Sequence, residues 1–203
     1  QITGTGFLQE GSSGTVILSG SNSYSGRTLV GSINGGALRI THPNALGDTV
    51  GNTEIWGNNN RTRNGRLEIV GGITVAEPIL MDGRQLDNTD VPAIVNVSGS
   101  NTMTGTITGG LGGGNWNIQT DGGKLTFAGN FNNNVAINSI RKLKLMGAGA
   151  GEWSGSINNA AGNVCLTQVI KTNSGTWVLS GANPNTGGTL NKEGTLLING
   201  SLV

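Results

Sequence analysis

The chain alternates apolar and polar residues in short phrases, and most phrases close on glycine or serine-glycine. Phrases of four to six residues with Val, Ile or Leu at every second position are typical of short β-strands with one buried face. Helices are disfavoured, because glycine interrupts nearly every window of ten residues. The best exception is T-H-P-N-A-L-G at 41–47, which predicts one short turn opened by Pro43 and closed by Gly47.

Two of the phrases form an internal repeat. The segment S-G-T-V-I-L-S-G-S-N-S-Y-S-G-R-T-L at 13–29 and the segment S-G-T-W-V-L-S-G-A-N-P-N-T-G-G-T-L at 174–190 are identical at ten of seventeen positions. Each copy continues to a second strand phrase, G-A-L-R-I at 36–40 and G-T-L-L-I at 194–198. Shorter versions lie between them, at 66–71, 93–99, 124–129 and 142–147. Phrases that start roughly 20–30 residues apart are typical of the coils of a solenoid.

Stacking explains why such short strands are repeated. A strand of this length buries two or three side chains, which does not offset an ordering cost of about 1–2 kcal/mol per residue. Stacked at about 4.8 Å, each coil buries its inward side chains against its neighbours. We therefore predict an all-β fold, one β-solenoid domain over residues 1–203 with about eight coils, part of a longer or polymerising chain. The residues expected to point inward in columns are Leu18, Leu38, Leu67, Val95, Leu125, Leu143, Leu179 and Leu196.

Composition and charge narrow the function. Gly makes up 37 of 203 residues without the three-residue period of collagen, and charged residues make up 11%. The net charge of +1 argues against nucleic acid as a partner. No apolar run is long enough for membrane insertion by this segment. Two small basic clusters are expected on the solvated surface, Arg61 with Arg63 and Arg66, and Arg141 with Lys142 and Lys144.

Residues that carry chemistry are scarce. His42 is the sole histidine and Cys165 the sole cysteine, so a catalytic triad has few candidates and a zinc shell or a disulfide has none. Asp82, Asp87 and Asp90 are the best candidates for paired carboxylates or a calcium site, and a polar loop is the simpler interpretation. We predict no catalytic residues, no metal site and no cofactor, and therefore no enzyme.

Four tryptophans stand out because aromatic residues make up 4% of the chain. Trp116 and Trp177 alternate with apolar residues, which favours the core. Trp56 and Trp153 are flanked by glycine or small polar residues, which makes them candidates for contact with surface glycans, with burial as the open alternative.

Both ends of the chain read as strands rather than as polar caps. Q-I-T-G-T-G-F-L-Q-E opens the sequence and T-L-L-I-N-G-S-L-V closes it. Uncovered strand edges pair readily with another chain. We expect copies of the chain to associate end to end through Ile2, Phe7, Leu196, Ile198, Leu202 and Val203.

The repeat phrases and the continuation G-G-A-L-R-I-T-H-P-N-A-L-G resemble the autotransporter-associated β-strand repeat at roughly 1–50 and 168–200. The resemblance implies a right-handed parallel β-helix from the passenger of a secreted bacterial protein, at the cell surface or outside the cell, and it brings no catalytic residues. A structural surface or filament module is the function favoured here. A carbohydrate-binding adhesin is the alternative, and a polysaccharide-cleaving enzyme is a third and weaker one.

Overall fold

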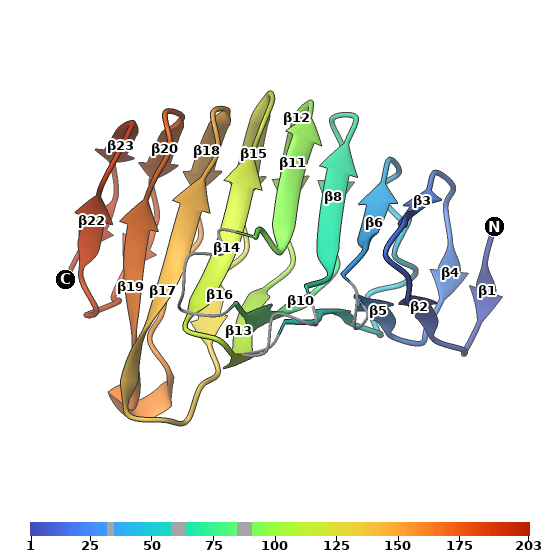
Figure 1. The fold of residues 1–203 in the computed structure, drawn as a ribbon, viewed down its shortest axis with the longest axis horizontal. Helices are drawn as coiled ribbons and strands as arrows, with labels where there is room; N and C mark the ends of the chain where they lie inside the picture. The colour runs from blue at the N-terminus through green and yellow to red at the C-terminus, as the bar shows by residue number, and fades with distance from the viewer. Residues whose placement is uncertain (32–34, 58–63, 85–90) are drawn as a thin grey trace.

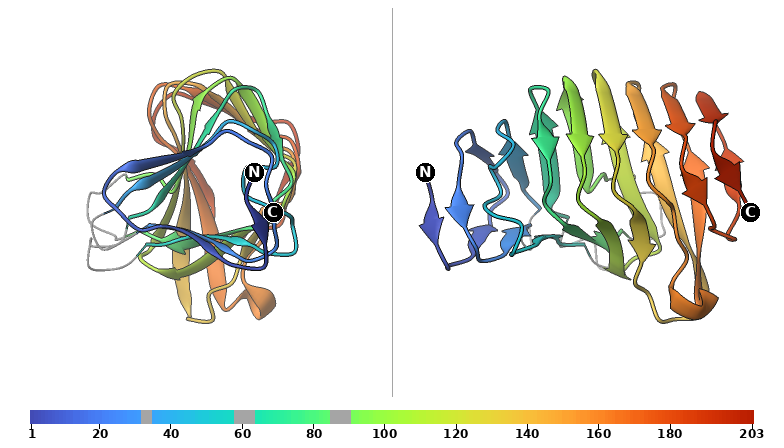
Figure 2. Two further views of the ribbon diagram at one scale, coloured as in Figure 1. Left: turned by 90° about the vertical axis from the view of Figure 1, so that its right-hand side faces the viewer. Right: turned by 180° about the vertical axis from the view of Figure 1, so that it is seen from behind.

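The computed structural model describes residues 1–31, 35–57, 64–84 and 91–203. The chain winds into an elongated β-solenoid with its termini at opposite ends (Figure 1). Seen from the N-terminal end, the chain runs clockwise as it recedes, which makes the solenoid right-handed (Figure 2). Paired strands within the sheets are parallel throughout the described residues, as the resemblance implied.

Three sheets form the sides of the solenoid, and we name them by their place in a coil. The first side holds six strands: β2 (Leu8–Glu10), β5 (Thr28–Val30), β7 (Thr53–Ile55), β10 (Ile79–Gly83), β13 (Ile107–Gly112) and β16 (Phe131–Asn133). The second side holds eight strands: β3 (Thr15–Leu18), β6 (Ala37–Ile40), β8 (Arg66–Val70), β11 (Ile94–Ser98), β14 (Asn115–Thr120), β17 (Ser139–Met146), β19 (Cys165–Lys171) and β22 (Thr189–Asn191).

The third side holds six strands: β9 (Thr74–Val75), β12 (Ser100–Met103), β15 (Lys124–Phe127), β18 (Ala150–Trp153), β20 (Thr176–Leu179) and β23 (Thr195–Ile198). Two short pairs complete the ends, β1 (Thr3–Gly4) with β4 (Ser23–Tyr24), and β21 (Ala182–Asn183) with β24 (Ser201–Leu202). A three-residue 3-10 helix, η1 (Ala161–Asn163), lies before β19. Residues 41–47 form the single turn expected there, with Gly47 at a φ of 93°.

The solenoid has about six complete turns, since two of its three sides hold six strands each. The predicted eight is slightly too high. The second side reaches eight strands, two more than either of the other sides. The segment between β18 and β19, which contains η1, also adds length outside the three sheets, which a division of chain length by coil length does not foresee.

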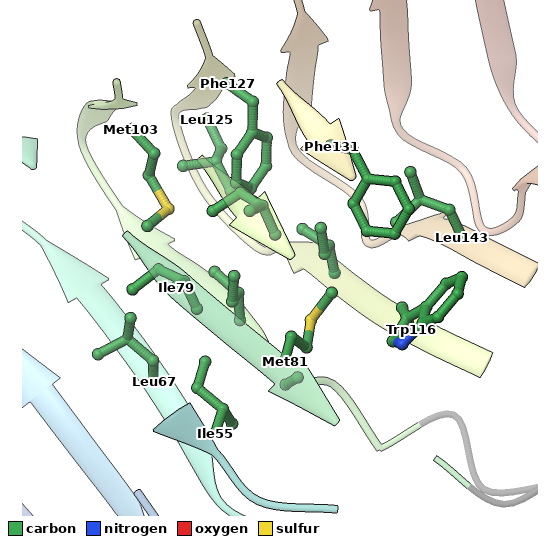
Figure 3. Packing of buried hydrophobic residues seen from close by; sticks show 14 of the residues in the cluster. Ile55, Leu67, Ile79, Met81, Met103, Trp116, Leu125, Phe127, Phe131 and Leu143 are labelled. Atoms are coloured by element: carbon green, nitrogen blue, oxygen red, sulfur yellow. The ribbon is translucent and has the colours of Figure 1, made fainter. Parts of the chain in front are cut away.

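The core is a set of side-chain columns that run along the axis. On the second side, residues directly paired across neighbouring strands are all buried: Leu38, Leu67, Ile94, Ile118 and Leu145. Figure 3 shows Leu67 among other buried residues of the core. Leu18 begins a second column, and Leu143 lies in a third with Trp116 and Val169. Leu125 and Leu179 are also in the core, and Leu196 packs against it half-buried.

The prediction that Val95 points into the core is wrong. It pairs with Glu68 on one side and Gln119 on the other, and these belong to the outward column of the second side. Its neighbour Ile94 occupies the inward place instead. The phrase A-I-V-N-V places apolar residues next to each other, so alternation alone did not decide which of the two faces inward.

Large aromatic side chains fill part of the core in the C-terminal half. Phe127 stacks on Trp153 with ring centroids 4.3 Å apart, and Trp177 lies 6.4 Å from Phe127. Trp177 fits because the residue paired with it is Gly151, where an added Cβ would lie 2.4 Å from the indole. The repeat therefore accepts tryptophan at the place of Val16 only where a neighbouring coil provides the room.

One corner of the solenoid, just before the first side, is a ladder of glycines. At Gly105, Gly129, Gly155 and Gly181, an added Cβ would lie 2.0–2.2 Å from a carbonyl oxygen of the coil before. Gly26, Gly51 and Gly200 continue the same ladder toward the two ends. Coils pack this closely only because the corner lacks side chains.

Candidate interaction surfaces

The two ends of the solenoid present strand edges. At the N-terminal end, β1, β2 and β3 are the outermost strands of their sheets, and at the C-terminal end β22, β23 and β24 are (Figure 1). Backbone groups on such edges are ready to pair with an added strand.

Apolar side chains accompany these edges. The predicted contact residues Ile2, Phe7, Ile198, Leu202 and Val203 are exposed, and Phe7 retains 66% of its surface. The structure also exposes apolar end residues that sequence reasoning did not single out: Val16, Ile17, Leu190 and Leu197. In the neighbouring coils the residues paired with the inward Val16 and Ile198 are the fully buried Leu38 and Leu179. The end coils therefore combine free edges with uncovered apolar surface.

Trp153 is not available to a sugar. Its side chain is fully buried, stacked on Phe127 and edge-on to Phe131 at 5.8 Å, and its indole Nε1 donates to the carbonyl of Gly129 at 3.2 Å. The prediction of a glycan contact at Trp153 is therefore wrong. Its small polar neighbours belong to the tight corner after β18 rather than to an exposed loop. Trp56 is half-buried after β7, and a glycan contact there stays a prediction.

A polar groove crosses the outer face of the second side. Arg39 and Arg66 form ion pairs with the two carboxylate oxygens of Glu68, and each Nη2–oxygen distance is 2.6 Å. The pair flanks a hollow of about 320 Å³, and a second hollow of about 220 Å³ also touches Arg66. The larger hollow is lined by Arg39, Arg66, Glu68, Pro92, Val95, Val97, Gln119 and Asp121. Planar polar side chains of this kind suit hydroxyl-rich ligands.

The predicted catalytic and metal candidates do not form a site in the part of the chain that the structure describes. Asp87 and Asp90 lie outside the described residues. Asp82 accepts from the backbone of Gly57 at 3.4 Å, and His42 Nδ1 accepts from the backbone of Asn44 at 3.1 Å, so each serves its own turn or corner. Among the described residues, no three of His, Cys, Asp and Glu are grouped as metal ligands.

A buried carboxyl group lies inside the N-terminal coils. Glu77 replaces glycine in the corner ladder, two residues before Ile79 as Gly105 is two before Ile107. Burial raises the pKa of Glu77 to about 8, opposed by the hydrogen bond from Thr53 and assisted by the charge of Asp48. Its Oε2 has no hydrogen-bond partner among the described residues. Sequence reasoning missed this group, because a lone Glu in a polar segment is usually a surface residue.

Two buried cations brace backbone corners. Lys171 occupies an inward position paired with Leu145, and its Nζ donates to the carbonyls of Thr172 at 2.6 Å, Asn173, and Glu193 at 3.1 Å. Arg84 donates to the carbonyls of Trp56 at 2.6 Å and of Gly65. Burial lowers the pKa of both groups, that of Arg84 to about 10. Their partners are carbonyls of the fold itself, so both cations serve structure.

Among the described residues, no helix is long and apolar enough to cross a membrane. The family model of the passenger-associated-transport-repeat matches residues 12–40 and 169–198. The chain carries this repeat twice. No curated protein and no solved structure matches the chain. The resemblance found in the two repeat phrases is thus confirmed, and together with the solenoid it fits an autotransporter passenger.

The two copies of the passenger-associated-transport-repeat do not occupy the same sides of the solenoid. The first copy places β3 and β6 on the second side and β5 on the first. The second copy places the equivalent strands β20 and β23 on the third side and β22 on the second. Glycines agree with this shift, since Gly26 lies in the corner ladder whereas its equivalent Gly187 packs on Thr167 at the next corner. The repeat has therefore advanced by one side between its two copies.

Proposed function

We propose that the chain is a structural, non-catalytic module of a bacterial passenger protein, exposed at the cell surface or outside the cell, whose end coils stack on further copies. The observation that carries the proposal is the pair of solenoid ends, where outermost strands coincide with exposed apolar residues such as Ile17 and Leu197. A coil gains its stability from neighbours on both faces, so an end coil is stabilised by an added coil. Repetition of a head-to-tail contact produces an open filament.

Sedimentation over a range of concentrations, with electron microscopy of the assembled material, tests the proposal. Leu197→Lys places a charge on the C-terminal edge at an exposed position, so the fold is preserved and strand addition is opposed. Association is expected to weaken at least about tenfold, equivalent to about 1.4 kcal/mol. Leu111→Lys is the matched control, because Leu111 is 56% exposed and lies on β13, an inner strand of the first side. A wild-type chain that remains monomeric at high concentration overturns the proposal.

A second function is favoured by the polar groove on the second side. Guanidinium groups of Arg39 and Arg66 and the amide of Gln119 line it together, which suits binding of a glycan chain. A glycan array with the wild-type chain and an Arg39→Gln variant tests this function. Binding that the variant loses supports it, and equal binding by both or none by either argues against it.

A further inference from the structure

Two neighbouring strands of the second side run on beyond the rest of their sheet and form a projecting ribbon, residues 134–141 with 158–168. Strands β17 and β19 pair with each other from their first residues onward. Strand β14 joins β17 only from Lys142, and β22 joins β19 only from Val169. Figure 1 shows the ribbon, with η1 at its end, projecting past the strands of the first side.

The ribbon carries most of the large apolar side chains that are exposed away from the end strands. In the part of the chain that the structure describes, five such side chains are exposed: Val50, Leu111, Ile137, Ile140 and Val164. The last three belong to the ribbon and keep 44–54% of their surface accessible. A hollow of about 90 Å³ between the two halves of the ribbon adds to this apolar surface.

The composition of the ribbon favours a lipid bilayer over a protein as the partner. Its apolar side chains are aliphatic, and residues 134–141 and 158–168 contain no aromatic residue and no methionine. Protein interfaces are enriched in both, whereas burial in the outer part of a bilayer requires only apolar area. A projecting shape also lets the ribbon enter a surface while the body of the solenoid stays outside.

Basic side chains lie at the base of the ribbon. Lys142 is two residues from Ile140 on β17 and therefore shares its outward face. Arg141, between them, donates to the backbone carbonyls of Gly112 and Gly113. Each basic side chain close to an anionic bilayer strengthens binding about fivefold.

The charge of the whole chain is divided in the same sense. Residues 122–203 contain six basic and two acidic residues, a net charge of +4, whereas residues 1–121 contain six basic and nine acidic residues. Charge asymmetry of this kind is typical of chains that face a membrane or another anionic surface with one part. The apolar ribbon lies in the basic part, so an anionic bilayer attracts the region that carries it.

We propose that the ribbon docks on an anionic phospholipid bilayer, with Ile137, Ile140 and Val164 at the boundary between headgroups and acyl chains and with Lys142 at the lipid phosphates. Such a contact lies on the bilayer and needs no spanning segment. It goes beyond the proposed function, since it gives the module a partner on its flank and does not depend on association between copies.

Co-sedimentation with vesicles tests the proposal. The chain is expected to bind vesicles of equal parts phosphatidylglycerol and phosphatidylcholine, and to bind phosphatidylcholine vesicles at least about tenfold more weakly. Ile137→Asp should weaken binding at least about tenfold, and Lys142→Gln about fivefold on the anionic vesicles alone. Val50→Asp and Lys192→Gln are the matched controls, because both positions are exposed and lie outside the ribbon.

A fluorescent label identifies the part of the chain that meets the lipid. Cys165 is buried and is first replaced by alanine. An environment-sensitive dye is then attached to Ile137→Cys or to Val50→Cys. Emission from position 137 is expected to shift to the blue on anionic vesicles, because the dye leaves water, whereas emission from position 50 should not change.

Three results would overturn lipid docking by the ribbon. One is a chain that does not bind the anionic vesicles, and another is binding without a blue shift at position 137. A shift of equal size at positions 137 and 50 is the third, since contact is then not made by the ribbon. If the shift at position 137 grows with protein concentration in the absence of lipid, the ribbon is an interface between copies and the proposal fails.

Discussion

Single positions in this solenoid differ sharply in what they tolerate, because inward and outward residues alternate along every strand. Leu179 is fully buried in the column of Trp153, whereas its neighbour Val178 faces outward. Leu179→Asp is expected to prevent folding, at a cost above about 4 kcal/mol for a buried unpaired charge. Val178→Asp is the matched control and should fold. Thermal unfolding of both variants checks this, and a Leu179→Asp variant with the wild-type melting temperature would contradict the core assignment.

Glu77 gives the N-terminal coils a distinct pH dependence. The folded-state pKa of about 8 lies above the ordinary value of 4.5, so between these values the folded state binds more protons than the unfolded state. Stability from this group is therefore complete below about pH 4.5 and is lost as the pH rises through about 8. Glu77→Gln is neutral throughout and should flatten this part of the profile while raising stability at the alkaline end.

Denaturant unfolding of wild type and Glu77→Gln at several pH values between these limits measures the effect. Parallel profiles for wild type and Glu77→Gln would show that Glu77 is solvated.

At the scale of strands and corners, the close approach of coils depends on the glycine ladder. Gly129→Ala would bring a Cβ within 2.1 Å of the carbonyl oxygen of Gly105, so the backbone must shift. We expect a loss of about 1–3 kcal/mol, typical of overpacking. Gly20→Ala is the control, since nothing lies within 4 Å of its added Cβ. Equal melting temperatures for the two variants would argue against tight corner contact.

Strand phrases and the repeat sufficed to predict a solenoid, because alternation and glycine-closed turns are local signals. Its parallel, right-handed course was implied by the family resemblance. The local pattern did not decide whether Ile94 or Val95 faces inward, or whether Trp153 is buried or exposed. Both depend on what the neighbouring coil presents, as the pairing of Gly151 with Trp177 illustrates. Buried charges such as Glu77 and Lys171 escaped notice for the same reason, since their partners come from other coils or from the corner backbone. The one-side shift of the repeat could not be predicted either, because it is visible only in the order of the strands in the sheets.

At the scale of the whole molecule, the strands run across the long axis, so the backbone hydrogen bonds between coils run along it. Tension applied at the two termini therefore pulls directly on those bonds and opens them a few at a time from an end, rather than loading a whole sheet in shear. Unfolding under force should proceed in small successive steps, each releasing about 80–90 Å for a coil of about 25 residues.

Single-molecule stretching from residues 1 and 203 measures those steps. One abrupt event at high force would contradict the coil-by-coil sequence. A module that lengthens gradually and re-winds when the load falls acts as a shock absorber, a mechanical property that follows from the direction of its hydrogen bonds alone.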